Sequence, residues 1–176
     1  MKIKKLIILI IILSVVFLFS GNVYSQDKEF YNKAVKYARQ KNLDFAFTYL
    51  DMVVNIYPNS KFFENSLFSC GEYYFISGDH FSAKKTFEKF TALLPNSKAK
   101  PFALAYLLRI AEEEKKQDII EGLQKQIISY KQLSLVFRDF KEHSYLSALD
   151  REYKIIYFID RAEIYIDGDL FAKIPF

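Results

Sequence analysis

The sequence is poor in the residues that carry most enzyme and metal chemistry. It contains one cysteine, Cys70, and two histidines, His80 and His143. A single thiol excludes an internal disulfide, so packing alone must hold the fold together, even in an oxidising compartment. Neither histidine has another potential ligand at metal-binding spacing, and we expect both at the solvated surface. Cys70 directly precedes Gly71 in an apolar helical pattern, which favours a small buried side chain over a nucleophile.

Recognisable catalytic motifs and a strong charge are also missing. The sequence has no phosphate-binding loop, nucleophile elbow or paired acidic motif, so we predict no enzyme activity, no catalytic residue, no cofactor and no metal. The formal net charge is +4, and Lys2, Lys4 and Lys5 contribute three of these charges. The remainder of the chain is nearly neutral and gives no long-range attraction to phosphate backbones. A nucleic-acid partner is therefore not expected.

Residues 1–25 have the organisation of a secretory signal, with a basic start, an apolar run and a polar end. We predict cleavage after Ser25. The apolar run from Leu6 to Phe19 has 14 residues, against the roughly 20 that span a bilayer as a helix, and a permanent N-terminal anchor is the alternative. Lipid attachment needs a cysteine just after such a run, and Cys70 lies far downstream. We expect an exported protein, periplasmic or extracellular, attached to a membrane only if the signal is retained.

A four-residue motif occurs twice. Pro58-Asn59-Ser60-Lys61 recurs 37 residues later as Pro95-Asn96-Ser97-Lys98, and the same interval relates the surrounding positions. The second copy has Leu67, Gly71, Tyr74, Gly78, Ala83, Phe87 and Pro95 where the first has Phe30, Ala34, Tyr37, Lys41, Ala46, Leu50 and Pro58. Each copy holds two apolar-periodic segments split by a short polar break, which is typical of an antiparallel helix pair.

The breaks within the copies contain helix-ending and helix-starting residues. Gly78 suits the left-handed residue that ends a helix, and Asn42 and Asp79 can cap the helix that follows. Lys41 stands where the second copy has this glycine. Ser60 and Ser97 can cap the first helix of the next pair, and the small residues at helix contacts allow two backbones to approach closely.

This pattern resembles the tetratricopeptide repeat, and the lengthened form with a linking "YPNSK" resembles a subgroup found in bacterial envelope assembly and cell-division proteins. The resemblance covers residues 27 to about 130 and implies a mainly α fold. A third helix pair is expected over residues 99–114 and 119–130, in a register that the sequence leaves ambiguous. We predict a tetratricopeptide-like α-solenoid of about three helix pairs, ending in a short C-terminal β-hairpin or three-stranded meander.

The C-terminal residues change character. Residues 153–159, 163–166 and 170–174 are rich in β-branched and aromatic residues, and Asp167-Gly168 predicts a tight turn. Residues 162–168 resemble the first half of a PEGA-type β module; the alternative is an ordinary hairpin that packs on the last helices and caps the solenoid. A helix is predicted over residues 137–149. The expected organisation is a signal peptide (1–25), helical repeats (26–131) and an α+β cap (132–176).

In proteins of the resembling family, the first helix of each pair lines a concave binding face. The residues that helical phase turns toward this face are Tyr31, Val35, Arg39, Asn65, Phe68, Glu72 and Phe75. Phe68 and Phe75 either form an exposed apolar patch there or are buried against a neighbouring pair. The resulting hypothesis is a non-enzymatic scaffold that binds protein partners in cell-envelope assembly or maintenance. The alternative is a cell-wall or surface-matrix binding component that acts through the C-terminal strands.

Overall fold

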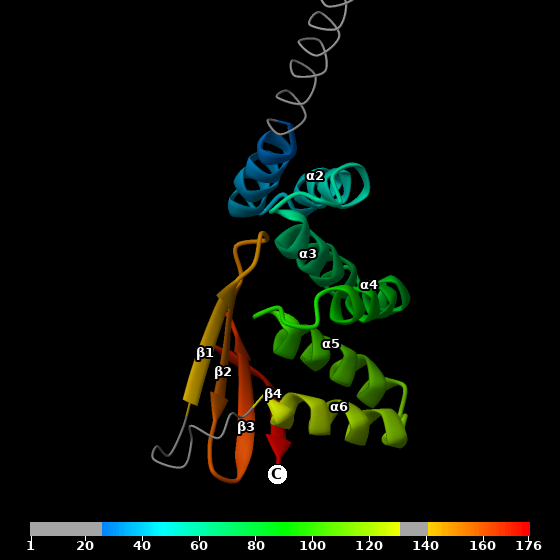
Figure 1. The fold of residues 1–176 in the computed structure, drawn as a ribbon, viewed down its shortest axis with the longest axis vertical. Coiled ribbons are helices and arrows are strands. Elements are labelled where there is room, and N and C mark those ends of the chain that lie inside the picture. Colours follow the sequence, from blue (N-terminus) through cyan, green and yellow to red (C-terminus); the bar gives the residue numbers. More distant parts are fainter. Residues whose placement is uncertain (1–25, 131–140) are drawn as a thin grey trace, which may run out of the picture.

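The computed structural model describes residues 26–130 and 141–176 (Figure 1). The predicted signal peptide, its cleavage point after Ser25 and the predicted boundary between residues 131 and 132 lie outside these residues. Within the described part of the chain, every helix is too short or too polar to cross a membrane.

Three helix pairs stack along the long axis of the molecule (Figure 1). The first helix covers residues 26–39. The others are α2 (Leu43–Ile56), α3 (Phe63–Ile76), α4 (His80–Leu93), α5 (Lys100–Glu113) and α6 (Gln117–Ser129). From α2 to α6 each helix packs against the next, and rings of the first helix contact Tyr49 of α2. The prediction of a tetratricopeptide-like array of three pairs is confirmed.

The turn inside each pair repeats with the same period. Lys41, Gly78 and Lys115 lie 37 residues apart and have φ values of 61°, 82° and 56°. The Asn42 side chain accepts a hydrogen bond from Phe45 N at the start of α2, and the Asp79 carboxylate accepts one from Ser82 N at the start of α4. The predicted turns are confirmed, and Lys115 fixes the register of the third pair.

Small residues lie where the helices cross. Ala34, Ala46 and Ala83 are fully buried. A Cβ atom added to Gly71 would lie 2.8 Å from the Phe87 ring, closer than real Cβ contacts come. The close approach of α3 and α4 therefore requires glycine at this position.

The repeated Pro-Asn-Ser-Lys loops are tied to the helices on either side. The Ser60 hydroxyl accepts a hydrogen bond from Phe62 N and donates one to the Asp27 carboxylate at 2.5 Å. One repeat later, Ser97 accepts from Ala99 N and donates to the Glu64 carboxylate at 2.7 Å. The prediction that these serines cap α3 and α5 is wrong in detail, because Phe62 and Ala99 occupy the cap positions without a side-chain cap bond.

A four-stranded antiparallel meander follows, in the order β1-β2-β3-β4. Its strands are β1 (Lys141–Leu146), β2 (Glu152–Tyr157), β3 (Arg161–Ile166) and β4 (Asp169–Pro175). The predicted tight turn is confirmed, since Asp167 and Gly168 have φ values of 54° and 88°, as a two-residue hairpin with this twist requires.

The prediction of a helix over 137–149 is wrong for the part that the structure describes, and the sheet has one strand more than the largest predicted meander. Residues 137–140 lie outside the described residues. From Glu142 to Leu146 side chains alternate between exposed and half-buried, which is the period of a strand, and β1 pairs along its length with β2. Long-range pairing therefore decides the conformation of a segment whose local composition favours no strand.

The sheet does not cap the end of the solenoid as predicted. It runs beside the helices (Figure 1), with one face of β2 and β3 buried against them. Tyr153 and Ile155 of β2 and Ile164 of β3 share a single hydrophobic core with residues of α3 and α5. The sheet therefore lies on the side of the solenoid formed by the first helices of the second and third pairs.

Candidate protein-binding groove

The sheet covers the middle of the predicted concave face. Phe68 of α3 is completely buried. Its ring meets Tyr145 of β1 and Tyr153 of β2 edge-on, with centroid separations of 5.1 and 5.3 Å. The option of an exposed patch is wrong for Phe68, and its cover is the C-terminal sheet as well as the neighbouring helices.

Glu72 of α3 lies under the same sheet with no exposed surface. Its carboxyl group accepts hydrogen bonds from the Tyr153 hydroxyl and from Ser69 Oγ at 2.9 Å. The Tyr153 and Tyr106 hydroxyls lie 2.7 Å apart, which extends this buried polar network to α5. Burial raises the pKa of Glu72 to about 7, although its hydrogen bonds and the Arg151 charge act in the opposite direction.

Phe75, at the other end of α3, is half-buried. Its ring lies 4.8 Å from Tyr106 and 6.1 Å from Phe171 of β4, and it stacks on His80 at 4.9 Å. Phe75 therefore contacts both the third helix pair and the sheet, and it contributes little free apolar surface.

Asn65 marks the edge of the covered region. Its side-chain NH₂ donates to the Tyr31 hydroxyl at 2.8 Å. Its side-chain oxygen accepts hydrogen bonds from the Tyr145 hydroxyl at 2.7 Å and from Ala148 N at 3.0 Å. One amide thus joins the first helix, α3, strand β1 and the loop after it, and three of the four hydrogen bonds that such an amide can make are formed inside the protein.

A cavity of about 650 Å³ remains between the helix of residues 26–39 and the β1–β2 loop. It contains four of the seven predicted concave-face residues: Tyr31, Val35, Arg39 and Asn65. The other lining residues are Asn32, Lys36, Gln40, Leu146, Ser147 and Asp150. We call this cavity the first-helix groove.

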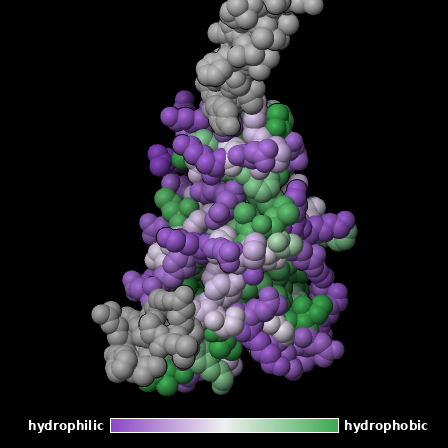
Figure 2. Space-filling view, viewed as in Figure 1, coloured by the Kyte–Doolittle hydropathy of each residue, from purple (hydrophilic) through white to green (hydrophobic). Residues whose placement is uncertain are grey.

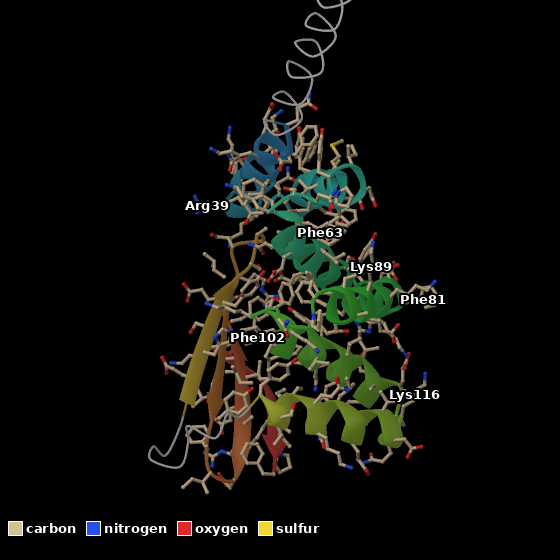
Figure 3. The ribbon with its side chains drawn as sticks, in the orientation of Figure 1. Arg39, Phe63, Phe81, Lys89, Phe102 and Lys116 are labelled. Atoms are coloured by element: carbon tan, nitrogen blue, oxygen red, sulfur yellow. The ribbon has the colours of Figure 1, made fainter. Side chains whose placement is uncertain are left out.

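The groove has a mixed chemical character. Val35 and Tyr31 provide apolar surface, while Lys36 and Arg39 provide positive charge. Arg39 lies at the end of the first helix (Figure 3), and its Nε is 3.4 Å from the Asp150 carboxylate. Both side chains are well exposed, at 65% and 36%, so this ion pair is weak and can exchange for another partner.

Sequence reasoning missed the wall of the groove that the β1–β2 loop provides. Leu146 and Ser147 lay in the segment predicted as a helix, and Asp150 directly follows that segment. Residues 142–145 are mainly polar and show no alternation of apolar and polar side chains, so no local signal indicated this strand.

The histidines and the cysteine lie outside the groove. His80 Nδ1 is 2.7 Å from the Glu113 carboxylate, and His143 Nε2 is 2.9 Å from the Lys98 carbonyl oxygen. Cys70 is buried in α3, and burial raises the pKa of its thiol. Among residues 26–130 and 141–176, no cluster of three or more histidine, cysteine or acidic side chains is arranged to hold a metal ion.

A family model described as YfiO, outer membrane lipoprotein, matches residues 24–161, most of the chain. The chain belongs to this family. The comparison with curated proteins finds no match. Membership confirms the expectation of a tetratricopeptide-like protein of the cell envelope, and it supports a role in protein–protein interaction. The resemblance to a PEGA-type module is not supported, because residues 161–175 form the last hairpin of a meander packed on the helices.

Proposed function

We propose that this YfiO-family chain is a non-enzymatic scaffold in cell-envelope assembly or maintenance, and that it binds a segment of a partner protein in the first-helix groove. The observation that supports this proposal most directly is the position of the groove. It is the part of the concave face that the protein's own sheet leaves open, and it contains Tyr31, Val35 and Arg39.

The way the chain covers its own concave face suggests how a partner is held. Next to the groove, Ala148 N donates hydrogen bonds to Asn65 Oδ1 and to Ser69 Oγ, both at 3.0 Å. Tyr145 adds an aromatic contact on Phe68. Polar helix side chains thus bind the backbone of a non-helical segment, while its aromatic side chain packs between them. Asn32, Lys36 and Gln40 offer equivalent polar groups in the groove.

The partner segment that fits the groove carries an apolar side chain and an acidic or carbonyl group close together. Val35 and Tyr31 bind the apolar side chain, and Lys36 and Arg39 bind the oxygen atoms. Arg39 can leave Asp150 for such a partner, since their contact is long and exposed.

Photo-crosslinking tests the proposal. A crosslinking amino acid at position 35 should capture an envelope protein, and the same amino acid at position 81 should not, because Phe81 is exposed on α4 away from the groove (Figure 3). The Val35→Asp/Arg39→Glu double variant should lose the partner. The charge-reversal control Lys89→Glu, on the exposed surface of α4, should retain it. Identical capture from positions 35 and 81 would refute binding in the groove.

Binding to cell wall or surface matrix is the second candidate, supported by a shallow cavity of about 610 Å³ against the sheet, with Lys154, Ile156 and Tyr165 among its lining residues. Removing the strands would uncover Phe68, so point variants are the better test. Sedimentation with purified peptidoglycan should be reduced by Lys154→Glu/Tyr165→Ala if this candidate is correct. Unchanged sedimentation, or none in the wild type, would exclude it.

A further inference from the structure

The N-terminal end of the solenoid carries an apolar surface that the protein-binding proposal does not use. We call it the end face, and it consists of Phe30 and Tyr37 from the first helix and Phe45, Tyr49, Met52 and Ile56 from α2. Phe45 and Ile56 are 54% and 58% exposed. The Tyr37 ring stacks on Phe45 and on Tyr49 at 5.3 and 5.7 Å. On the face shown in Figure 2, this end of the molecule carries hydrophilic residues with a few hydrophobic ones among them.

The internal repeat provides a control for this surface. Phe45, Tyr49, Met52 and Ile56 recur at intervals of three and four residues and so form one stripe along α2. The residues 37 positions later, on α4, are Ser82, Thr86, Lys89 and Leu93. The corresponding stripe of α4 is therefore mainly polar, and the apolar stripe is a property of α2 rather than of the repeat.

The second pair also shows what a covered face of this kind looks like. Tyr74, the counterpart of Tyr37, meets Phe47 of α2 edge-on, with a centroid separation of 5.1 Å. Tyr73 beside it stacks on the same ring at 4.3 Å. Tyr37 stacks on two rings of its own pair, Phe45 and Tyr49, but within the described residues no ring of another helix pair covers it. The end face is thus a stacking surface that lacks a described partner.

We propose that the end face rests on the lipid surface of the envelope membrane. Tyrosine and phenylalanine are suited to this position, because a tyrosine ring inserts among the acyl chains while its hydroxyl stays at the headgroup level. Lys33 lies 5.5 Å from the Tyr49 ring centroid, at the border of the end face. Its ammonium group is 2.6 Å from the Glu29 carboxylate, in an exposed ion pair that a lipid phosphate can replace.

The position of the end face in the chain supports this occupant. In the alternative in which the N-terminal segment is retained as an anchor, its apolar run ends at Phe19, and residue 26 at the start of the described first helix lies within about 25 Å of that run at about 3.5 Å per residue. The chain belongs to a family of outer membrane lipoproteins, yet its one cysteine is 3% exposed inside α3 and is not a site for a lipid. An aromatic surface would supply membrane contact without a lipid attached to cysteine.

This orientation leaves the first-helix groove accessible. At about 100° per residue, Phe30 and Tyr37 lie on one side of the first helix, and Tyr31, Val35 and Arg39 are turned away from them by roughly 100° to 200°. The two surfaces therefore do not compete. Membrane contact by the end face and protein binding in the groove can fail or succeed independently of each other.

Tryptophan fluorescence tests the proposal, since the sequence contains no tryptophan. The full chain with Phe45→Trp is mixed with vesicles of phosphatidylethanolamine and phosphatidylglycerol that contain spin-labelled phosphatidylcholine. We expect its emission to shift to shorter wavelength and to lose intensity through quenching by the spin label. The matched control is Phe81→Trp, which is the same substitution at a phenylalanine that is 69% exposed on α4. Its emission should not change.

Further measurements separate the alternatives. Adding Ile56→Asp to the Phe45→Trp chain should remove the quenching without changing the circular dichroism spectrum, which checks that the helices remain folded. Absence of quenching at position 45, or equal quenching at position 81, would overturn the proposal. A spectral shift that depends on protein concentration and not on lipid would assign the end face to a second copy of the chain instead.

Discussion

The first and second helix pairs share one 37-residue pattern but have different neighbours. Phe68 and Glu72 of the second pair correspond to Tyr31 and Val35 of the first. The second pair packs under the sheet, where Phe68 and Glu72 have no exposed surface, whereas Tyr31 and Val35 line the open groove. The repeat therefore determines the backbone, and the side chains at matched positions determine whether a surface is covered by the chain itself or left open.

The largest expected effect comes from removing the aromatic ring beneath the sheet. Phe68→Ala should destabilise the protein by about 4 kcal/mol, because it leaves a cavity among several aromatic rings. Tyr31→Ala should cost only about 1 kcal/mol, since this half-buried ring loses one stacking contact and one hydrogen bond. Urea unfolding measures both values. Equal losses would show that the two positions do not differ in burial as described.

The buried acid of the second pair should make stability depend on pH. Burial raises the pKa of Glu72 to about 7, whereas a glutamate in the unfolded chain titrates near 4.3, so the folded state binds the extra proton between these values. Stability contributed by this group is complete below about pH 4.3 and falls by about 4 kcal/mol as the pH rises from there through 7.

Glu72→Gln tests this pH dependence, because it keeps the shape and removes the titration. Unfolding free energies of wild type and variant should converge near pH 4 and diverge toward pH 8, with the variant more stable. Tyr153, Tyr106 and Ser69, which surround the carboxyl group, are unchanged in this comparison. Parallel pH profiles for the two proteins would contradict the assignment to Glu72.

The small residues at the helix contacts should respond in a position-specific way. Gly71→Ala should cost about 1 to 3 kcal/mol, because the new methyl group meets the Phe87 ring. Gly122→Ala on α6 meets nothing within 4 Å, and it should stabilise the protein by up to about 1 kcal/mol through helix propensity. Chemical denaturation of both variants checks the contrast, and a stabilising Gly71→Ala would argue against the close approach of α3 and α4.

The smallest effect is expected at the turn inside each pair. Lys41 and Gly78 both adopt positive φ, and this conformation costs a residue with a side chain about 1 kcal/mol. Lys41→Gly should therefore raise the melting temperature slightly, and Gly78→Lys should lower it. Changes in the same direction at both positions would mean that the two turns are not equivalent.

Local rules predict much of this fold. Turns are indicated at Gly78-Asp79 and at Asp167-Gly168 by backbone preferences that do not depend on distant residues. The structure has a turn at both places. Strand β1 was not predicted, because its conformation depends on pairing with β2. Its sequence of charged and polar residues alone favours neither a strand nor a helix.

The sequence allowed prediction of the helix face that contains the candidate site, but not of how much of that face stays open. Helical phase turns Tyr31 and Phe68 in the same direction, and both lie on the side of the solenoid that the sheet borders. What separates them is a set of contacts between residues about 80 positions apart, such as Asn65 with Tyr145 and Ala148. Periodicity within one helix contains no information about such contacts, so the division into covered and open parts required the structure.

The placement of the sheet also has a mechanical consequence. Solenoids of helix pairs behave as springs, because each pair touches only its neighbours. Here the rings of Phe68 in α3 and Phe102 in α5 both contact Tyr153 of a single strand, so β2 braces two successive pairs. Stretching or twisting the second pair against the third would have to break these contacts, and this part of the molecule should transmit a pulling force as a stiff rod.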